Sequence, residues 1–228
     1  MSKAIFWDFD GTLVKSNTSF LDSLMKALKN AQVTIPCSDC GQFLKSACSW
    51  YFPEKTYFDR TGELWWQTLL SRLQNFLTDF SVPVDKIPAI CTCFRQNVVS
   101  YPYELYGDAL SVLKAAGDLG FQNYILSNNF PELSQVICRY GLDPYLKDVF
   151  LSSDLGAEKP CAEIFTAAIE KAEKPFPAVM VGDNPTADIS GAKAVGMTAI
   201  LVHKDISCRE ADFISASLQG VLPFLRNL

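Results

Sequence analysis

The sequence predicts an α/β protein in which a doubly wound parallel sheet carries an inserted, all-helical domain. Short apolar runs bounded by turn residues recur along the chain and alternate with helical patterns, which favours parallel strands joined by helices. The stretch from about residue 16 to residue 100 breaks this alternation, because its apolar residues keep helical spacing throughout. We therefore predict a core domain from residues 1–15 and 101–228, and a helical domain from residues 16–100.

The first strand is expected in the apolar run from Ala4 to Trp7. It leads directly into Asp8, and Asp10 follows two residues later. Side chains alternate along an extended chain, so these two carboxylates lie on the same side. Folding alone gives no reason to place two acids there, whereas open α/β sheets bind ligands at the carboxyl ends of their strands. The pair is therefore a candidate functional site.

The helical domain should contain four helical stretches with breaks at proline-containing segments. Their approximate ranges are residues 20–28, 38–51, 54–80 and 87–99, and Gly62 is a possible break within the third. The many aromatic residues here are interpreted chiefly as the core of a small bundle, which needs large side chains to fill it.

From Tyr101 onward, strands and helices alternate. Strands are expected at residues 121–126, 149–151, 178–181 and 198–202, and helices at residues 108–119, 131–141, 160–172 and 185–195. Ser207 and Glu210 have the spacing of a capping box, which predicts a final helix there.

Polar residues follow several of these strands. Ser127 and Asn128 end one strand, Lys159 precedes a predicted helix, and Asp183 follows an apolar strand with Asp188 five residues later. Each residue has an ordinary structural explanation on its own, since serines cap helices and most lysines are solvated. Their common position at one edge of the sheet predicts a shared site.

These segments carry a resemblance to a known family. The run Asp8-Phe9-Asp10-Gly11-Thr12-Leu13 resembles the first signature of the haloacid dehalogenase superfamily in its phosphatase form. Ser127, Lys159 and the block from Gly182 to Ala192 resemble the second, third and fourth signatures, in the family's order. Residues 152–160 resemble the branch of phosphoglycolate phosphatase-like proteins, which have a Rossmann-like core and a helical cap.

The resemblance implies a Mg²⁺-dependent phosphatase that hydrolyses a small phosphorylated metabolite through an aspartyl-phosphate on Asp8. Asp10 would protonate the leaving alcohol and later deprotonate the attacking water, while Lys159 would neutralise the charges of nucleophile and phosphate. Asp188 would orient the site from behind the residues that contact metal and substrate, or it would hold Lys159 or a metal-bound water.

The resemblance also implies two sets of binding residues. Mg²⁺, which prefers oxygen ligands, would be held by Asp8, by Asp183 and by Asp10, the last through its main-chain carbonyl. The predicted substrate-binding residues are Thr12, Ser127, Asn128 and Lys159.

Three other functions fit parts of the pattern. A phosphomutase related to β-phosphoglucomutase would use the same site and return the phosphate to a sugar, and only cap residues separate it from a phosphatase. A haloacid dehalogenase would use Asp8 without a metal, which leaves Asp10 and the acidic fourth block unexplained. A regulatory module without activity would not need the intact set of Asp8, Asp10, Lys159 and Asp183.

The net charge and the lengths of the apolar runs indicate which classes of partner to expect. A net charge of −5 among 228 residues disfavours nucleic acid, whose phosphates attract clustered Lys and Arg. No apolar stretch reaches the roughly 18 residues of a membrane span, and the start shows no signal-peptide pattern, so we expect a cytoplasmic protein. The sequence is compatible with a monomer or a homodimer.

Cysteines and the lone histidine are interpreted as structural. Cys37, Cys40, Cys91 and Cys93 could in principle form a zinc site, but the second pair is spaced more tightly than usual, which favours free thiols. His203 comes directly at the end of the last predicted strand, after Val202, and no motif requires it.

Overall fold

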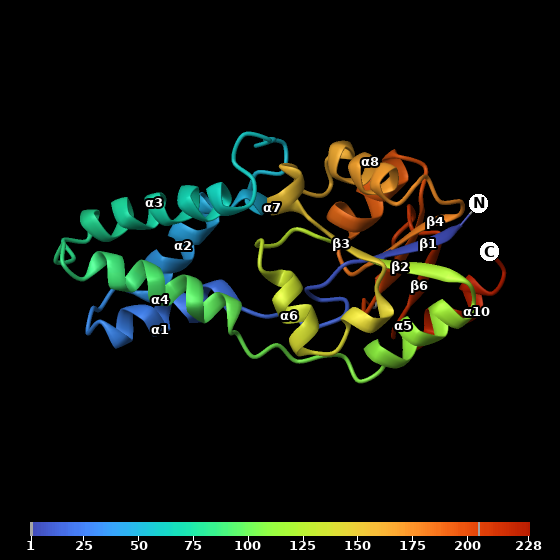
Figure 1. Cartoon of the computed structure of the whole chain (residues 1–228), viewed down its shortest axis with the longest axis horizontal. Coiled ribbons are helices and arrows are strands. Elements are labelled where there is room, and N and C mark those ends of the chain that lie inside the picture. Colours follow the sequence, from blue (N-terminus) through green and yellow to red (C-terminus); the bar gives the residue numbers. More distant parts are fainter. Residues whose placement is uncertain (1, 205) are drawn as a thin grey trace.

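A six-stranded sheet forms the centre of the computed structural model, which describes residues 2–204 and 206–228. All neighbouring strands are parallel, in the order β3-β2-β1-β4-β5-β6 (Figure 1). The strands are β1 Lys3–Trp7, β2 Phe121–Ser127, β3 Asp148–Leu151, β4 Ala178–Gly182, β5 Thr198–Val202 and β6 Phe213–Ser215. The doubly wound parallel sheet predicted from the sequence is therefore confirmed.

Strand β1 is covered on both faces, which explains its uninterrupted apolar run. Ile5 and Trp7 belong to one buried cluster, and Ala4 and Phe6 belong to another on the opposite face. The first cluster includes residues from α5 Ala109–Asp118, α6 Leu133–Arg139 and α10 Leu222–Leu225, and the second includes residues from α8 Ala162–Lys171 and α9 Gly191–Ala194.

The direction of winding reverses at β1. The chain passes from β1 to β2 and β3 on one side and then to β4, β5 and β6 on the other. Such a switch point opens a crevice at the carboxyl ends of the strands, where α/β sheets bind their ligands.

Four helices form a separate bundle beside the sheet, which we call the helical cap (Figure 1). They are α1 Ser19–Asn30, α2 Cys37–Ala47, α3 Glu63–Asp79 and α4 Ile87–Val99. Aromatic side chains join the cap to the core, because Phe130 of the core lies 6.1 Å, between ring centroids, from both Phe20 and Trp66. The division into two domains at residues 15 and 101 stays a prediction.

The two segments that connect the cap to the core run side by side. Val14 forms an antiparallel bridge with Leu105, and the Lys15 N–H donates to the Glu104 carbonyl at 2.8 Å.

No described helix has both the length and the apolar character needed to cross a membrane.

The segment 54–62 is not helical, contrary to the prediction. Helix α3 begins only at Glu63, after Gly62 with a positive φ of 58°. The N–H groups of Tyr57 and Gly62 donate to the carbonyls of Gly156 and Ser153, so this segment is bonded to the core instead of coiling on itself. The preceding helix also ends early, at Ala47, and a short 3₁₀ turn follows at Ser49–Tyr51.

The helix predicted from the Ser207 and Glu210 spacing was wrong. The Glu210 carboxylate accepts a hydrogen bond from the Ser190 hydroxyl, so it does not cap a helix. The chain instead continues into β6, and its last helix is α10. The predicted helix at 185–195 begins as a π-helical segment, Pro185–Ser190, before α9.

Candidate active site

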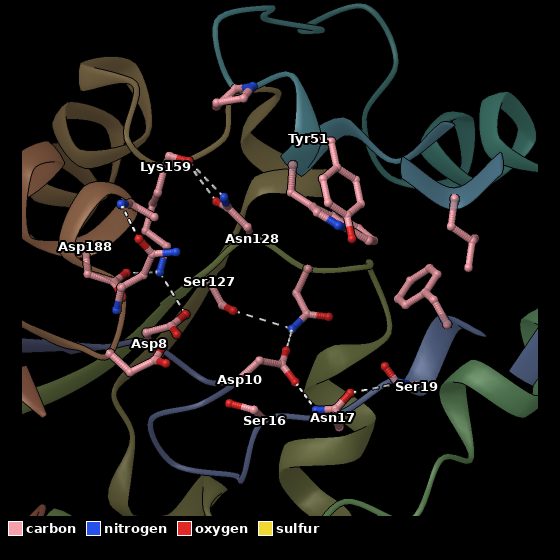
Figure 2. A pocket seen from close by; sticks show the side chains of 18 of the residues that line it. Asp8, Asp10, Ser16, Asn17, Ser19, Tyr51, Ser127, Asn128, Lys159 and Asp188 are labelled. Carbon is pink, nitrogen blue, oxygen red and sulfur yellow. Dashed lines mark hydrogen bonds and ion pairs between the residues drawn. The ribbon is translucent and has the colours of Figure 1, made fainter. Parts of the chain in front are cut away.

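Most of the predicted site residues gather around one cavity of about 680 Å³ between the core and the helical cap (Figure 2). Asp8 follows β1, Ser127 ends β2 and Asp183 follows β4, so the parallel sheet brings them to one edge. The core side of the cavity is lined by Asp8, Asp10, Ser127, Asn128, Asn129, Lys159, Pro160, Asp183, Asn184, Thr186, Ala187 and Asp188.

Lys159 occupies the centre of the site. Its Nζ donates to Asp8 Oδ1 at 2.7 Å, to Asp188 Oδ1 at 2.6 Å and to the Leu126 carbonyl at 2.8 Å. Burial alone would lower the pKa of the Lys159 ammonium, but the carboxylates of Asp188 and Asp8 outweigh burial and raise that pKa. Lys159 is therefore a buried cation that offsets two buried anions.

Asn128 holds the main chain of this lysine. Its Oδ1 accepts from the Lys159 N–H at 2.7 Å, and its Nδ2 donates to the Lys159 carbonyl at 3.0 Å. The side chain predicted to bind substrate thus has both of its polar atoms engaged with Lys159.

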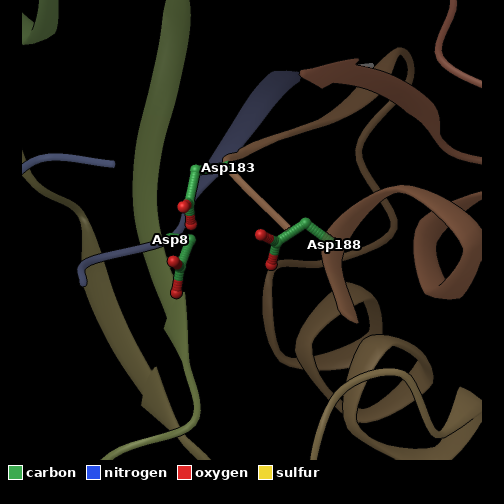
Figure 3. Close-up of side chains that lie close together, drawn as sticks. All are labelled: Asp8, Asp183 and Asp188. Atoms are coloured by element: carbon green, nitrogen blue, oxygen red, sulfur yellow. The ribbon is translucent and has the colours of Figure 1, made fainter. Parts of the chain in front are cut away.

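Three carboxylates approach one another closely enough to share a cation. Asp8, Asp183 and Asp188 each offer an oxygen within 4.8 Å of the others, and they come from three places in the chain (Figure 3). Burial raises the pKa of Asp183, while its ion pair with Lys204 at 2.9 Å opposes that rise. Burial also raises the pKa of Asp188 to about 6, although Lys159 lowers it.

This carboxylate cluster suits Mg²⁺, which takes oxygen ligands and retains several waters. Among the described residues, these three carboxylates are the one cluster of acidic, histidine or cysteine side chains close enough to hold a metal ion. The cysteine pairs form no such cluster there. All eight cysteines are free thiols. The Asp10 carboxylate is not part of the cluster, and the ligand implied for that residue, its main-chain carbonyl, stays a prediction.

The glycine between the first acids and Thr12 is required by this crowding. Gly11 has a φ of +83°, and a Cβ atom placed on it would lie 2.6 Å from Asp183 Cγ. Only glycine allows the turn to pass so close to the Asp183 carboxylate.

Asp10 is held by two asparagine side chains. Asn17 Nδ2 donates to Asp10 Oδ1 at 2.6 Å, and Asn129 Nδ2 donates to Asp10 Oδ2 at 2.7 Å (Figure 2). Burial is the main cause that raises the pKa of the Asp10 carboxyl to about 6, the Asn17 hydrogen bond opposes it, and the Asp8 charge adds to the rise. A carboxyl with this pKa can both give and take a proton near neutral pH.

Replacing Asp10 with Asn should make the metal-free protein more stable relative to the wild type as the pH rises from about 4 to about 6. The folded pKa of Asp10 lies above its unfolded value, so this carboxyl stabilises the fold below that window and loses the contribution as the pH rises. Asparagine has no such titration. Urea unfolding of both proteins in EDTA across this range measures the difference, and a difference that does not grow with pH contradicts the assignment.

Thr12, a predicted substrate-binding residue, lies outside the cavity walls, and so does His203, for which no role in the site was predicted. Thr12 is fully buried and does not line the cavity. Its hydroxyl lies 3.5 Å from Asp8 Oδ2, so it contacts the nucleophile candidate from the protein interior. His203 stacks on Tyr106 with 3.7 Å between ring centroids, and its Nε2 lies 3.1 Å from the Thr12 carbonyl.

Sequence reasoning missed the two asparagines and the cap wall. Asn129 stands directly after Ser127 and Asn128, and Asn17 stands in the polar segment after the first signature, so position in the sequence was the only available signal. The cap side of the cavity is lined by Ser16, Asn17, Thr18, Ser19, Phe20, Leu21, Gly41, Leu44, Lys45, Trp50, Tyr51 and Pro53.

Comparison with known proteins points to one family. The model of the haloacid dehalogenase-like hydrolases matches residues 2–196. A glyceraldehyde 3-phosphate phosphatase from Methanothermobacter thermautotrophicus is 26% identical over 220 residues, 94% of this chain and 91% of that protein. A phosphoserine phosphatase from Thermus thermophilus is 32% identical over 106 residues, 46% of this chain and 43% of that protein.

A solved structure extends the likeness to the whole fold. The HAD-hydrolase YfnB from Bacillus subtilis, bound to magnesium, superposes with a TM-score of 0.76 at 19% identity, covering 100% of this chain and 99% of that one. At this identity the likeness concerns the fold alone.

Proposed function

The chain belongs to the haloacid dehalogenase-like hydrolase family, and we propose that within it the protein is a Mg²⁺-dependent phosphatase of a small phosphorylated metabolite. The observation that carries this proposal is the buried Lys159, which joins Asp8 and Asp188 beside Asp183 at the mouth of the sheet. Relatives named as phosphatases, for glyceraldehyde 3-phosphate and for phosphoserine, support the same reaction.

Asp8 is the proposed nucleophile. Its Oδ1 accepts from Lys159, while Oδ2 has only the long contact with Thr12, which leaves one oxygen free to attack phosphorus. The bond from this oxygen to phosphorus forms as the bond to the leaving oxygen breaks, and Asp10 gives its proton to that leaving oxygen. Water then attacks phosphorus, Asp10 takes its proton, and Asp8 is released with inorganic phosphate.

Charge neutralisation is the main requirement of this reaction, because an anionic carboxylate must approach an anionic phosphate. Lys159 supplies one positive charge next to Asp8. Bound Mg²⁺ would supply further positive charge, and the carboxylates of Asp8 and Asp183 are the residues proposed to hold it. Lys204 pairs with Asp183 Oδ2 at 2.9 Å, so Mg²⁺ would compete with this lysine for that oxygen.

The leaving group is proposed to lie against the cap wall of the cavity. Trp50 and Tyr51 line this wall, and Tyr51 is 49% exposed although it is a large aromatic side chain. Lys45 lines the same wall from α2. These three side chains are the proposed determinants of substrate choice.

The cytoplasmic location and the oligomeric state of the protein stay predictions.

Hydrolysis of 4-nitrophenyl phosphate, measured with Mg²⁺ and with EDTA, tests the proposed function. We expect release of inorganic phosphate that requires Mg²⁺, since without the cation Asp8, Asp183 and the phosphate repel one another. A panel that includes glyceraldehyde 3-phosphate and phosphoserine would then rank substrates. Phosphate transfer to a sugar in place of water would favour the phosphomutase, and equal activity in EDTA would overturn the Mg²⁺ requirement.

A further inference from the structure

We propose that Asn17 is a positioning residue that ties the orientation of the Asp10 carboxyl to the position of the helical cap. This inference rests on the proposed function, because it concerns the group assigned there as general acid. Through this coupling, proton transfer from Asp10 to the leaving group would depend on the position of α1, the first helix of the cap.

The contacts of Asn17 reach both the acid and the cap. Its Nδ2 donates to Asp10 Oδ1 at 2.6 Å, and its Oδ1 accepts from the Ser19 N–H at 3.0 Å. Ser19 is the first residue of α1, so one amide group joins the acid to the start of the cap bundle (Figure 2). Both ends of this amide are used, which fixes its rotation and leaves it one orientation.

The second support of Asp10 comes from the core, from the residues that follow β2. Asn129 Nδ2 donates to Asp10 Oδ2 at 2.7 Å, and Asn129 Oδ1 accepts from the Phe130 N–H at 3.1 Å. Each Asp10 oxygen therefore has its own amide donor, one from the cap side and one from the core. Loss of the Asn17 contact would leave the carboxyl held at one oxygen only.

Asn17 lies on the cap side of the connection between the two parts. The paired connecting segments end with the hydrogen bond from Lys15 to Glu104, two residues before Asn17. A rotation of the cap about this pairing would carry Asn17 with α1 while Asp10 stayed with the sheet. The acid would thus be fully oriented only with α1 in the position seen here.

This arrangement is compatible with proton transfer. An amide N–H only donates, and each oxygen of a protonated carboxyl keeps a lone pair that can accept it. The two asparagines can therefore orient Asp10 in both protonation states, and Asn17 itself takes no proton.

A series of substituted phenyl phosphates tests the proposal, because their shapes are similar while their leaving groups differ in basicity. 4-Nitrophenolate leaves as a stable anion and needs little protonation, whereas phenolate needs the acid more. For Asn17→Ala we expect kcat/KM with phenyl phosphate to fall by about tenfold to a hundredfold, which reaches the lower end of the roughly 10²–10⁴-fold that general acids contribute. The ratio kcat/KM reports phosphoryl transfer to Asp8 and not the later hydrolysis step, in which Asp10 acts as a base for every substrate alike. The kcat/KM with 4-nitrophenyl phosphate should change much less, so the dependence of kcat/KM on leaving-group basicity becomes steeper.

Two further variants separate positioning from folding. Asn17→Ser keeps an oxygen that can accept from the Ser19 N–H at the start of α1, but its side chain is too short to reach Asp10. It should show the same steeper dependence as Asn17→Ala. Asn30→Ala removes an exposed asparagine at the other end of α1 and should leave the dependence unchanged.

The outcomes are distinct. Equal losses of kcat/KM for all leaving groups, or an unchanged dependence in both Asn17 variants, would overturn the role of Asn17 while the phosphatase assignment stood. A folded wild-type protein that hydrolysed none of the phenyl phosphates with Mg²⁺ would overturn the proposed function and, with it, this inference.

Discussion

Replacing Asp8 with Asn is expected to lower kcat/KM for phosphate esters by about 10⁴-fold or more, the size of effect seen when a nucleophile is removed. The amide of Asn has the same shape as the carboxylate but cannot form an acyl phosphate. Lys159 would keep its bonds to Asp188 and to the Leu126 carbonyl, so its buried charge stays paired. The fold should persist, because the substitution removes one of three crowded carboxylates.

The control for this experiment is Asp85→Asn, which makes the same chemical change at an exposed position. It should leave kcat/KM unchanged, and both variants should unfold within about 1 kcal/mol of the wild type. A folded Asp8→Asn protein that retained a tenth of the wild-type activity would contradict the assignment of the nucleophile.

Replacing Lys159 with Met should damage both stability and activity. The Lys159 side chain is 2% exposed and its ammonium lies between two buried carboxylates, so its loss leaves uncompensated buried charge at a cost of about 3–5 kcal/mol. Activity should fall by about 10²–10³-fold, as when a charge-stabilising donor is removed. The loss of stability should shrink toward acid pH, because Asp188, whose pKa is already raised to about 6, then takes up a proton.

Urea unfolding of Lys159→Met at neutral and acid pH measures this effect. The matched control is Lys193→Met, which removes a lysine paired with Asp212 at 2.9 Å where both side chains are 36% exposed. That pair should contribute less than about 1 kcal/mol. The double variant Lys159→Met with Asp188→Asn should recover part of the stability. A Lys159→Met protein as stable as the control would show that Asp8 and Asp188 do not need this cation.

Strands β1 to β5 could be predicted because each is an apolar run that ends in a turn or in polar residues. A buried parallel strand leaves this mark directly in the sequence. β6 has only three residues, Phe213–Ser215, and short apolar runs of this length do not distinguish a strand from a loop. The spacing of Ser207 and Glu210 was misleading because Glu210 bonds instead to Ser190, which lies 20 residues away in the chain.

The core residues of the site were predictable for a related reason. Asp8 and Asp183 follow strands, and parallel strands must end at the same edge. The supports of Asp10 could not be predicted, because Asn17 and Asn129 come from distant parts of the chain and converge on Asp10 only in the folded protein. Helical spacing also shows which cap residues are buried, but it does not show that Tyr51 faces the cavity.

Chemical trapping of the phosphoenzyme tests most directly whether Asp8 is the nucleophile. The enzyme is quenched during turnover of an aryl phosphate with Mg²⁺ and then reduced with borohydride, which converts an aspartyl-phosphate to homoserine. Peptide mass spectrometry should find homoserine in place of Asp8, and only when substrate was present. Asp10, Asp183 and Asp188 should remain aspartate. Modification at one of those residues, or an unmodified Asp8 during confirmed steady turnover, would contradict the proposal that Asp8 carries the phosphoryl group.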